Sequence, residues 1–300
     1  MKILLFGKNG QLGWELQRSL APLGQVVALG SRDTRLPADF LEPERLVDTV
    51  RQVQPDVIVN AAAYTAVDRA ESERDAAHRV NTQAPGVLAQ AAQACGAWMV
   101  HFSTDYVFDG SGHRPWREAD PTGPLNVYGA TKLEGEQRVV QACSRHLVLR
   151  TSWVYAARGG NFARTMLRLA QERDHLSVVD DQFGAPTGAD LLADVTAHAL
   201  RAAMARPALA GLYHVVAGGE TSWHGYARHV LAAAQARGIA LRATPDRVDA
   251  VPTSAFPTPA RRPPNSRLDT QAFTSAFGLV LPDWRQGVDR MLTEVLQGQG

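Results

Sequence analysis

The most constraining feature of the chain is a glycine-rich turn close to its first residue. The apolar run ILLF (3–6) leads directly into GKNGQLG, which places glycine at positions 7, 10 and 13. Glycine permits a tight turn, and a helix that begins there offers unpaired N–H groups to a phosphate. This order of strand, glycine turn and helix predicts a dinucleotide-binding loop built on Gly7, Gly10 and Gly13. An ordinary glycine-rich turn is the alternative.

The rest of the first half alternates short apolar runs with helical patterns. Buried aliphatic runs separated by helices are typical of a parallel, doubly wound sheet of the Rossmann type, so we predict an α/β fold. The third predicted helix should be interrupted or kinked near Pro85. The predicted strands are 3–6, 25–29, 56–59, 97–103 and 146–152, and the predicted helices are 14–24, 43–53 and 71–96.

After residue 155 the alternation becomes less regular. Helical patterns cover 161–173, 190–204 and 222–237, and strand patterns cover 176–179 and 212–216. We assign residues 1–155 to a dinucleotide-binding domain that carries the catalytic residues, and 156–300 to a smaller α/β substrate-binding part. No linker is long enough to separate two independent domains, so the two parts should be interleaved.

Composition argues against several classes of partner. The 31 lysines and arginines balance the 30 acidic residues to a net charge of +1, which gives no electrostatic reason to expect nucleic acid or membrane binding. No apolar run approaches the ~20 residues of a membrane span. Cys95 and Cys143 form no C-x-x-C, and the nine histidines show no metal-ligand spacing. The first ten residues lack a signal-peptide pattern, so we expect a reduced, cytoplasmic protein.

The end of the second predicted strand bears on the choice of cofactor. Sites that prefer NAD place an acidic residue there to hold the ribose 2′-hydroxyl. This chain has Gly30-Ser31-Arg32 instead. Because no carboxylate would repel a 2′-phosphate and Arg32 would pair with it, NADPH is favoured and NADH is the second choice. In the alternative, Arg32 points to solvent and Asp33 takes the role of the acid.

Two further segments are candidates for cofactor contacts. The third strand runs into NAAAYT (60–65), whose small residues would let a cofactor lie against the backbone. Asp39 and Phe40, ahead of the second helix, are candidates to flank the adenine. A helix start signal beside a core aromatic residue explains that pair equally well.

A tyrosine and a lysine one helical turn apart carry the expected chemistry. Tyr128 and Lys132 share a helix face and follow Thr104, which stands at the end of the fourth strand. A free tyrosine titrates near ~10, and a neighbouring ammonium group together with the positive nicotinamide ring of the oxidised cofactor should lower that pKa. Tyr128 would then protonate a carbonyl oxygen as hydride reaches its carbon, with Thr104 holding the oxygen and Lys132 the nicotinamide ribose. Taken alone, the pair also fits a packed tyrosine beside a solvated lysine.

Motifs along almost the whole chain resemble the dTDP-4-dehydrorhamnose reductase family of the extended short-chain dehydrogenase/reductases. The glycine loop and the Tyr-x-x-x-Lys spacing are shared by that entire superfamily. STDYVFDG (103–110), DQFGAPT (181–187) and PTPARRPPNSRL (257–268) are more specific.

The resemblance implies a reaction and a set of site residues. The reaction is the reduction of the 4-keto group of dTDP-4-dehydro-β-L-rhamnose by NAD(P)H, giving dTDP-β-L-rhamnose. The catalytic set would be Thr104, Tyr128 and Lys132, and the dTDP-sugar would contact Thr104, Asp105 and Trp153. The cofactor would contact Gly10, Gln11, Leu12, Asp39, Phe40, Ala63, Tyr64 and Thr65, in addition to Ser31 and Arg32.

Charged residues elsewhere suggest two more contacts. Residues 251–266 form a proline-rich segment, which a solvated loop explains most simply. Alternatively, Arg261 and Arg262 in this segment and Arg267 directly after it would preorganise cations for a diphosphate. Some family members dimerise around magnesium held by acidic side chains. The resemblance therefore implies a homodimer and a magnesium ion, with Glu15, Asp190 and Glu294 as candidate ligands, although their spacing forms no metal motif.

Three other functions stay open on this fold. A sugar-nucleotide 4,6-dehydratase usually carries an Asp-Glu pair after the threonine, whereas Tyr106 follows Asp105 here. A 4-epimerase would turn over without net oxidation of its cofactor. A non-catalytic binding subunit, like the regulatory subunit of methionine adenosyltransferase, would need none of the catalytic groups.

Overall fold

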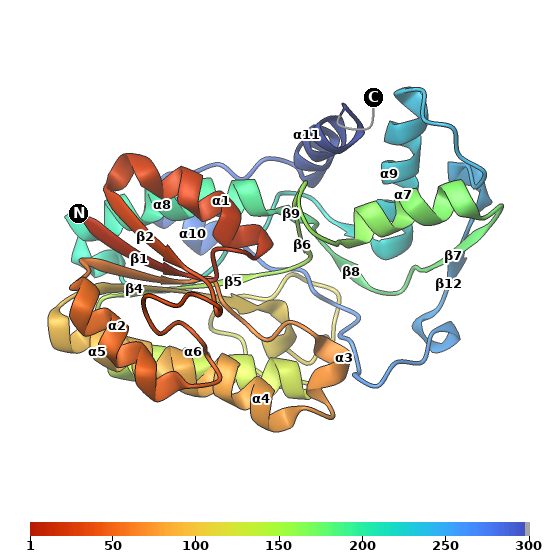
Figure 1. The fold of residues 1–300 in the computed structure, drawn as a ribbon. Helices are drawn as coiled ribbons and strands as arrows, with labels where there is room; N and C mark the ends of the chain where they lie inside the picture. The colour runs from red at the N-terminus through yellow and green to blue at the C-terminus, as the bar shows by residue number, and fades with distance from the viewer. Residues whose placement is uncertain (298–300) are drawn as a thin grey trace.

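Six parallel strands form the central sheet of the computed structural model, which describes residues 1–297 (Figure 1). Because β1 pairs with β2 on one side and with β3 on the other, the direction of the strand order reverses at β1. Open α/β sheets bind ligands at such a switch point. The predicted doubly wound α/β fold is confirmed. In spatial order the strands are β10 (Gly211–His214), β5 (His146–Thr151), β4 (Trp98–Thr104), β3 (Val57–Asn60), β1 (Lys2–Phe6) and β2 (Gln25–Leu29).

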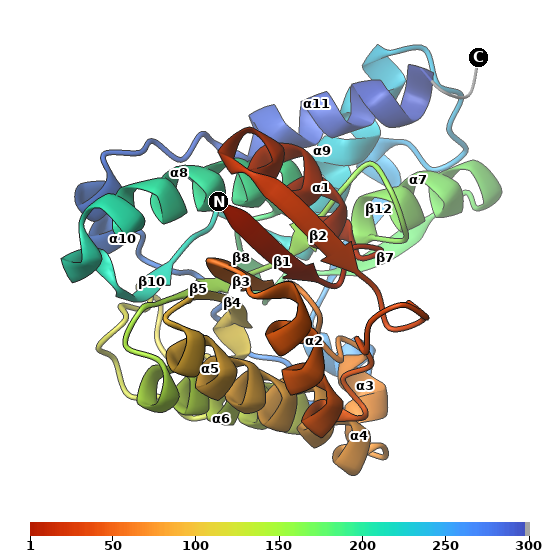
Figure 2. The same cartoon turned by 60° about the vertical axis from the view of Figure 1, so that its left-hand side comes forward.

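Helices cover both faces of the sheet (Figure 2). One layer contains α1 (Gln11–Leu20), α8 (Ala189–Ala205) and α10 (Gln271–Phe277). The other contains α2 (Leu46–Val53), α5 (Ala84–Cys95) and α6 (Val127–Ala142). Every residue of β3 and β4 is buried, as expected for parallel strands that are covered on both sides.

A second hydrophobic core lies beside the sheet. It contains the buried side chains of Tyr226 and Trp284 and is built from three helices and a parallel strand pair. These elements are α7 (Phe162–Glu172), β7 (Leu176–Val179), α9 (Trp223–Ala236), β12 (Val248–Val251) and α11 (Trp284–Gln297). Since α8, β10 and α10 return to the first core, a boundary at residue 155 divides the sequence but not the two cores.

Several elements differ from the sequence prediction. The expected break near Pro85 is a π-helical turn at Arg79–Gln83, which follows α4 (Arg74–His78). Pro85 itself sits in the first turn of α5, where a missing N–H breaks no helical hydrogen bond. We did not predict β12, α10 or α11. The short elements are α3 (Val67–Ala70), β6 (Val154–Tyr155), β8 (Phe183–Gly184), β9 (Thr187–Gly188) and β11 (Thr221–Ser222).

The π-helical turn supports α6 directly. The Thr82 hydroxyl donates to the carbonyl oxygen of Thr131 at 2.7 Å, and the Asn81 side-chain amide donates to the Thr131 hydroxyl at 3.2 Å. A Cβ atom on Gly135 would lie only 2.0 Å from the carbonyl oxygen of Asn81. The close approach of α6 to this turn therefore depends on glycine at position 135.

We expect Gly135→Ala to push α6 away from the π-helical turn. Overpacking of this kind costs about 1–3 kcal/mol, and kcat should fall as well because α6 carries Tyr128 and Lys132. Thermal unfolding and steady-state kinetics would measure both effects. Gly123→Ala is the matched control, since its new Cβ would meet only Asp109 at an ordinary 3.5 Å. An alanine variant as stable and active as the parent would contradict this role for Gly135.

Candidate active site

Residues predicted to be catalytic come together at the carboxyl end of β4. The Thr104 hydroxyl donates to Asp105 Oδ1 at 3.1 Å and accepts the backbone N–H of Tyr106 at 3.2 Å. The phenol of Tyr128, which α6 brings in from the next element, lies close enough to the Thr104 side chain for that side chain to lower the pKa of the phenol. The ring of Tyr106 lies edge-on to that of Tyr128, with centroids 5.7 Å apart.

Lys132 lies one helical turn beyond Tyr128, but its ammonium group does not contact the phenol. Nζ donates to the carbonyl oxygen of Phe102 in β4 at 2.5 Å, and the side chain is buried. Burial lowers the pKa of Lys132 to about 8, while the negative charge of Glu136 raises it.

The pKa of Tyr128 moves in the direction opposite to our expectation. Burial raises it to about 12; the hydrogen bond with Thr104 lowers it and the charge of Asp105 raises it. The predicted lowering of this pKa by Lys132 is wrong for the structure, because the ammonium group is directed to a backbone carbonyl. At neutral pH Tyr128 is therefore a protonated phenol.

Asp105 is a buried carboxyl group with one unpaired oxygen. Its Oδ2 has no hydrogen-bond partner. Burial raises the pKa of Asp105 to about 7, and the hydrogen bonds with Ser266 and Thr104 lower it. Ser266 belongs to the proline-rich segment, so this segment reaches the catalytic groups. We assigned Ser266 no role from the sequence, although it lies inside a motif that carries the family resemblance.

The glycine loop folds back on the end of β2 and opens the N-terminus of α1. The backbone N–H groups of Gly7 and Lys8 donate to the carbonyl oxygen of Leu29 at 2.9 and 3.1 Å, and Gly10 donates to Gly7 at 3.0 Å. A Cβ on Gly13 would lie 2.0 Å from the carbonyl oxygen of Gly7, so this close approach requires glycine. The first N–H groups of α1 have no partner within the helix and fit a pyrophosphate.

Gln11 and Leu12 stand at the start of α1. Leu12 packs against the first core, and Gln11 Nε2 donates to the carbonyl oxygen of Gly160 at 2.7 Å. The Gln11 Oε1 atom is buried without a partner, which is consistent with a polar ligand beside the loop.

Asp33 occupies the region where we expected no carboxylate. Its Oδ2 accepts Lys8 Nζ at 2.5 Å and the Gly30 N–H at 3.2 Å, and both contacts hold the pKa of Asp33 below its ordinary value. Ser31 and Arg32 are exposed. The structure thus corrects one premise of the NADPH preference, because an ionised acid does lie at the end of β2, already paired with a lysine of the glycine loop.

The segment after β3 is held from both sides by Asn81. The Tyr64 N–H donates to Asn81 Oδ1 at 2.8 Å, and Asn81 Nδ2 donates back to the Tyr64 carbonyl oxygen at 3.1 Å. The Tyr64 hydroxyl donates to Glu73; the neighbouring Ala63 is partly exposed and Thr65 is exposed. The backbone here is therefore fixed next to the switch point of the sheet.

The ring of Phe40 is buried against Phe6, with centroids 5.5 Å apart, as the core-aromatic alternative expects. The contact of Phe40 with the adenine stays a prediction. Asp39 is partly exposed, and its Oδ1 accepts the N–H of Leu41 at 2.9 Å.

Trp153 stands beyond β5 with an unusual backbone conformation. Its φ of 48° lies in the left-handed region, which is uncommon for a bulky residue and occurs often at functional sites. Its ring stacks on Trp223 of α9 at a centroid distance of 3.7 Å. Trp223 escaped the sequence analysis, because nothing in its local pattern distinguishes it from a core residue.

Two of the three candidate diphosphate arginines are engaged by carboxylates. Arg262 forms a two-pronged ion pair with Asp68, with Nη2 at 2.7 Å and Nη1 at 3.1 Å from the two oxygens. Arg267 Nε donates to Glu220 at 2.6 Å. Arg261 is exposed and forms no ion pair with any described residue, so it alone offers a free guanidinium group.

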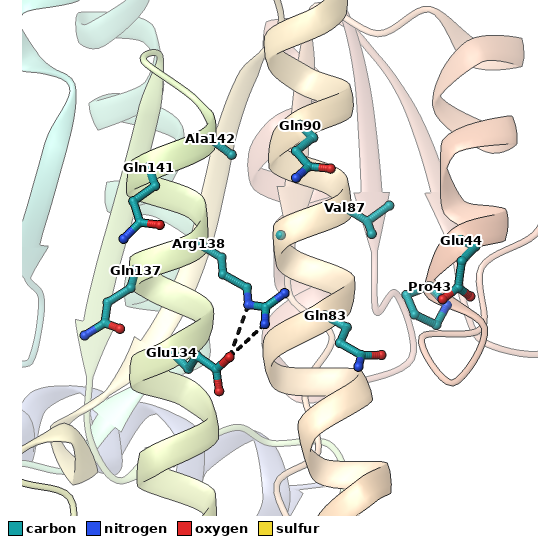
Figure 3. Close-up of a pocket in the computed structure, with 11 residues that line it drawn as sticks. Pro43, Glu44, Gln83, Val87, Gln90, Glu134, Gln137, Arg138, Gln141 and Ala142 are labelled. Carbon is teal, nitrogen blue, oxygen red and sulfur yellow. Dashed lines mark hydrogen bonds and ion pairs between the residues drawn. The ribbon is translucent and has the colours of Figure 1, made fainter.

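A hollow of about 750 Å³ between α5 and α6 is separate from these groups (Figure 3). Its walls are mostly polar and include an ion pair between Glu134 and Arg138 at 2.8 Å. None of the predicted site residues lines it. In the described part of the chain, no helix is both long and apolar enough to cross a membrane.

Comparison with known proteins shows the family of the chain. The model of the family described as "RmlD substrate binding domain" matches residues 1–297. A dTDP-4-dehydrorhamnose reductase of Shigella flexneri is 59% identical over 295 residues, which cover 98% of each chain. The chain belongs to the dTDP-4-dehydrorhamnose reductase family.

Solved structures of this family share the fold. A dTDP-4-dehydrorhamnose reductase of Clostridium acetobutylicum has a TM-score of 0.89 at 34% identity, over 99% of this chain and 100% of its own. One from Bacillus anthracis, in complex with NADP, has a TM-score of 0.88 at 34% identity, over 98% of this chain and 99% of its own.

The raised pKa of Asp105 predicts how the stability of the protein depends on pH. Because its pKa in the folded state, about 7, exceeds that of an unfolded aspartate, folding is favoured at low pH and loses stability as pH rises from about 4 to 7. Asp105→Asn removes this penalty. We expect it to raise Tm at pH 8 by a few degrees and to change Tm little at pH 4. Calorimetry at both values tests this; a Tm gain independent of pH would contradict it.

Proposed function

We propose that the chain reduces the 4-keto group of dTDP-4-dehydro-β-L-rhamnose with NAD(P)H and releases dTDP-β-L-rhamnose. Membership of the reductase family supports the reaction. The observation that carries the residue assignment is the proximity of the Tyr128 phenol to the Thr104 hydroxyl at the end of β4, with Lys132 anchored to the same strand. A proton donor, an orienting hydroxyl and a cation thus come from adjacent elements at the switch-point edge of the sheet.

In this proposal Tyr128 is the proton donor. A phenol with a pKa of about 12 stays protonated at neutral pH, which suits a group that must give a proton to the developing alkoxide. Thr104 orients the carbonyl oxygen beside the phenol. When bound, the reduced nicotinamide supplies the hydride. Asp105, with its unpaired Oδ2, and Trp153 would contact the sugar nucleotide.

Lys132 would hold the nicotinamide ribose and stabilise the phenolate that forms once the proton has left. Its ammonium group has further N–H donors besides the one that Phe102 accepts. A positive charge close to a phenolate favours that charged form. In this proposal the expected effect of Lys132 on the phenol operates once the proton has left and the oxidised cofactor is present.

The cofactor would lie across the glycine loop and the end of β3. Gly7, Gly10, Gly13 and the start of α1 would receive the pyrophosphate, and Ala63, Tyr64 and Thr65 would border the adjoining part. We propose that NADPH is preferred over NADH, since Lys8 neutralises Asp33 and the exposed Arg32 is free to meet a 2′-phosphate.

The family resemblance also supports a cytoplasmic homodimer, in which a magnesium ion would be held between the two subunits. Glu15 lies 3.5 Å from Arg18, and Arg290 lies 3.5 Å from both Asp190 and Glu294. Among residues 1–297 no three histidine, cysteine, aspartate or glutamate side chains gather to hold a metal. The three candidate acids therefore do not fit a magnesium site within one chain, and a site would need carboxylates from a second copy.

Tyr128→Phe tests the assignment of the proton donor. With dTDP-4-dehydrorhamnose generated in situ, the parent protein should oxidise NADPH stoichiometrically, and the variant should lose about 10²-fold or more in kcat because general acid catalysis disappears. Absorbance of the reduced nicotinamide follows the reaction. Turnover of the sugar without net NADPH oxidation would favour an epimerase, and binding without turnover would favour a non-catalytic subunit.

Arg32→Ala tests the preference for NADPH. Loss of the guanidinium group should raise KM for NADPH about tenfold, as expected for one charge-assisted contact, and leave KM for NADH nearly unchanged. Arg35→Ala, which removes a neighbouring exposed arginine, is the control. Equal effects on the two cofactors would contradict a contact between Arg32 and the 2′-phosphate.

A further inference from the structure

An ion pair is buried beneath the helix that carries the catalytic residues. Arg150 of β5 donates to Glu136 of α6 from Nε at 3.0 Å and from Nη2 at 2.8 Å, and the two side chains are only 5% and 2% exposed. Tyr128, Lys132 and Glu136 are spaced by four residues, so all three lie on the face of α6 turned toward the sheet.

Stability alone is a weak explanation for this pair. Removing two charges from water has a desolvation penalty that their attraction barely repays, and well-packed apolar side chains of similar size hold elements together as well or better. Glu136 and Arg150 therefore call for a reason other than cohesion. Their position, one turn from Lys132, suggests an electrostatic one.

Among the charged and titratable groups around Lys132, Glu136 is the one whose negative charge raises the pKa of Lys132. On α6, Tyr128 is a neutral phenol and Glu134 points to the opposite, exposed side. From β4, His101 lies near Lys132, and burial together with the positive charge of Lys132 lowers the pKa of His101, so this histidine is neutral.

The other elements around α6 present groups that are neutral or paired, except Asp105, which is ionised above a pH of about 7 and is not among the charges that shift the pKa of Lys132. From β10, His214 is kept neutral by burial and by Arg150, which lower its pKa to about 3. After β4, Asp105 has its pKa raised to about 7 and Tyr106 is a buried phenol. The π-helical turn presents Asn81 and Thr82, which are uncharged. The exposed His78 of α4 meets Glu134, and Asp68 of α3 is paired with Arg262.

The ion pair also connects the catalytic helix with the family-specific segments. Arg150 stacks over Phe108 at 5.1 Å, and Phe108 stacks on Trp116 at 4.6 Å. The indole N–H of Trp116 donates to the carbonyl oxygen of Asn265 in the proline-rich segment at 3.1 Å. A shift of Arg150 would therefore disturb both α6 and the proline-rich segment, which lie on either side of the proposed active site.

We propose that Glu136, held by Arg150, is a positioning residue that fixes α6 along the sheet and supplies the negative charge that keeps Lys132 protonated in its buried site. This inference rests on the role of Lys132 in the proposed function. Lys132 acts as the ammonium form, which is present below its pKa and lost as pH rises through it. Removal of the Glu136 charge should lower that pKa, since burial and the unpaired Arg150 would both oppose a second cation.

The test is the pH profile of kcat for Glu136→Gln, measured with NADPH and the 4-keto sugar nucleotide. We expect the alkaline limb of the profile, where kcat falls as Lys132 loses its proton, to move to lower pH by on the order of one unit. Glu136→Gln combined with Arg150→Gln removes both charges. The pH at which kcat of this double variant falls on the alkaline side should therefore lie between those of the single variant and the parent. Glu134→Gln, on the exposed side of the same helix, should keep the parent profile.

The outcomes separate this inference from the proposed function. A Glu136→Gln limb that superimposes on that of the parent, with only Tm lowered, would overturn the electrostatic role. If the parent protein turns over the sugar nucleotide without net oxidation of NADPH, the proposed function fails instead. Retained activity in Tyr128→Phe would overturn only the assignment of the proton donor. If Glu136→Gln does not fold, Glu136→Leu with Arg150→Leu replaces it as an apolar pair, and a parent-like limb there would equally overturn the inference.

Discussion

The seating of α6 on the end of β4 is the contact on which the rest of the site depends. Lys132 donates across this junction to the carbonyl oxygen of Phe102, and Tyr128 meets Thr104 one turn earlier. The junction is tight because Gly135 lets the helix lie against the π-helical turn. Asn126 caps α6 through its Oδ1, which accepts the N–H of Gly129, and donates from Nδ2 to Arg261 at 2.8 Å. The catalytic helix is thus joined at its start to the segment expected to hold the substrate.

Burial sets the protonation states around this junction. It raises the pKa of Tyr128 and Asp105 and lowers that of Lys132, because a low-dielectric environment disfavours the charged form of each group. A neutral phenol is suited to proton donation and a cation to the stabilisation of the resulting phenolate. Glu136 offsets the effect of burial on Lys132 and so helps to keep these two states apart.

Local sequence patterns predicted those parts of the protein that depend on neighbouring residues. The glycine loop, the strand at Gln25–Leu29 and the pairing of a tyrosine with a lysine on one helix are all readable at short range. Contacts across the chain could not be predicted from such patterns. The ring of Phe40 is buried on Phe6, Asp33 is paired with Lys8, and Arg262 and Arg267 are engaged by acids from distant elements.

The sequence by itself determined the α/β class, the position of the glycine loop and the side chains that are proposed to be catalytic, since periodicity and motif spacing are local properties. Only the tertiary structure decided which partner each charged or aromatic side chain contacts. The direction of Lys132 toward a backbone carbonyl, the partner of Glu136 and the stack of Trp153 on Trp223 all join residues far apart in the chain or on separate elements. Such contacts follow from how strands and helices pack, and packing depends on the whole chain rather than on any one segment.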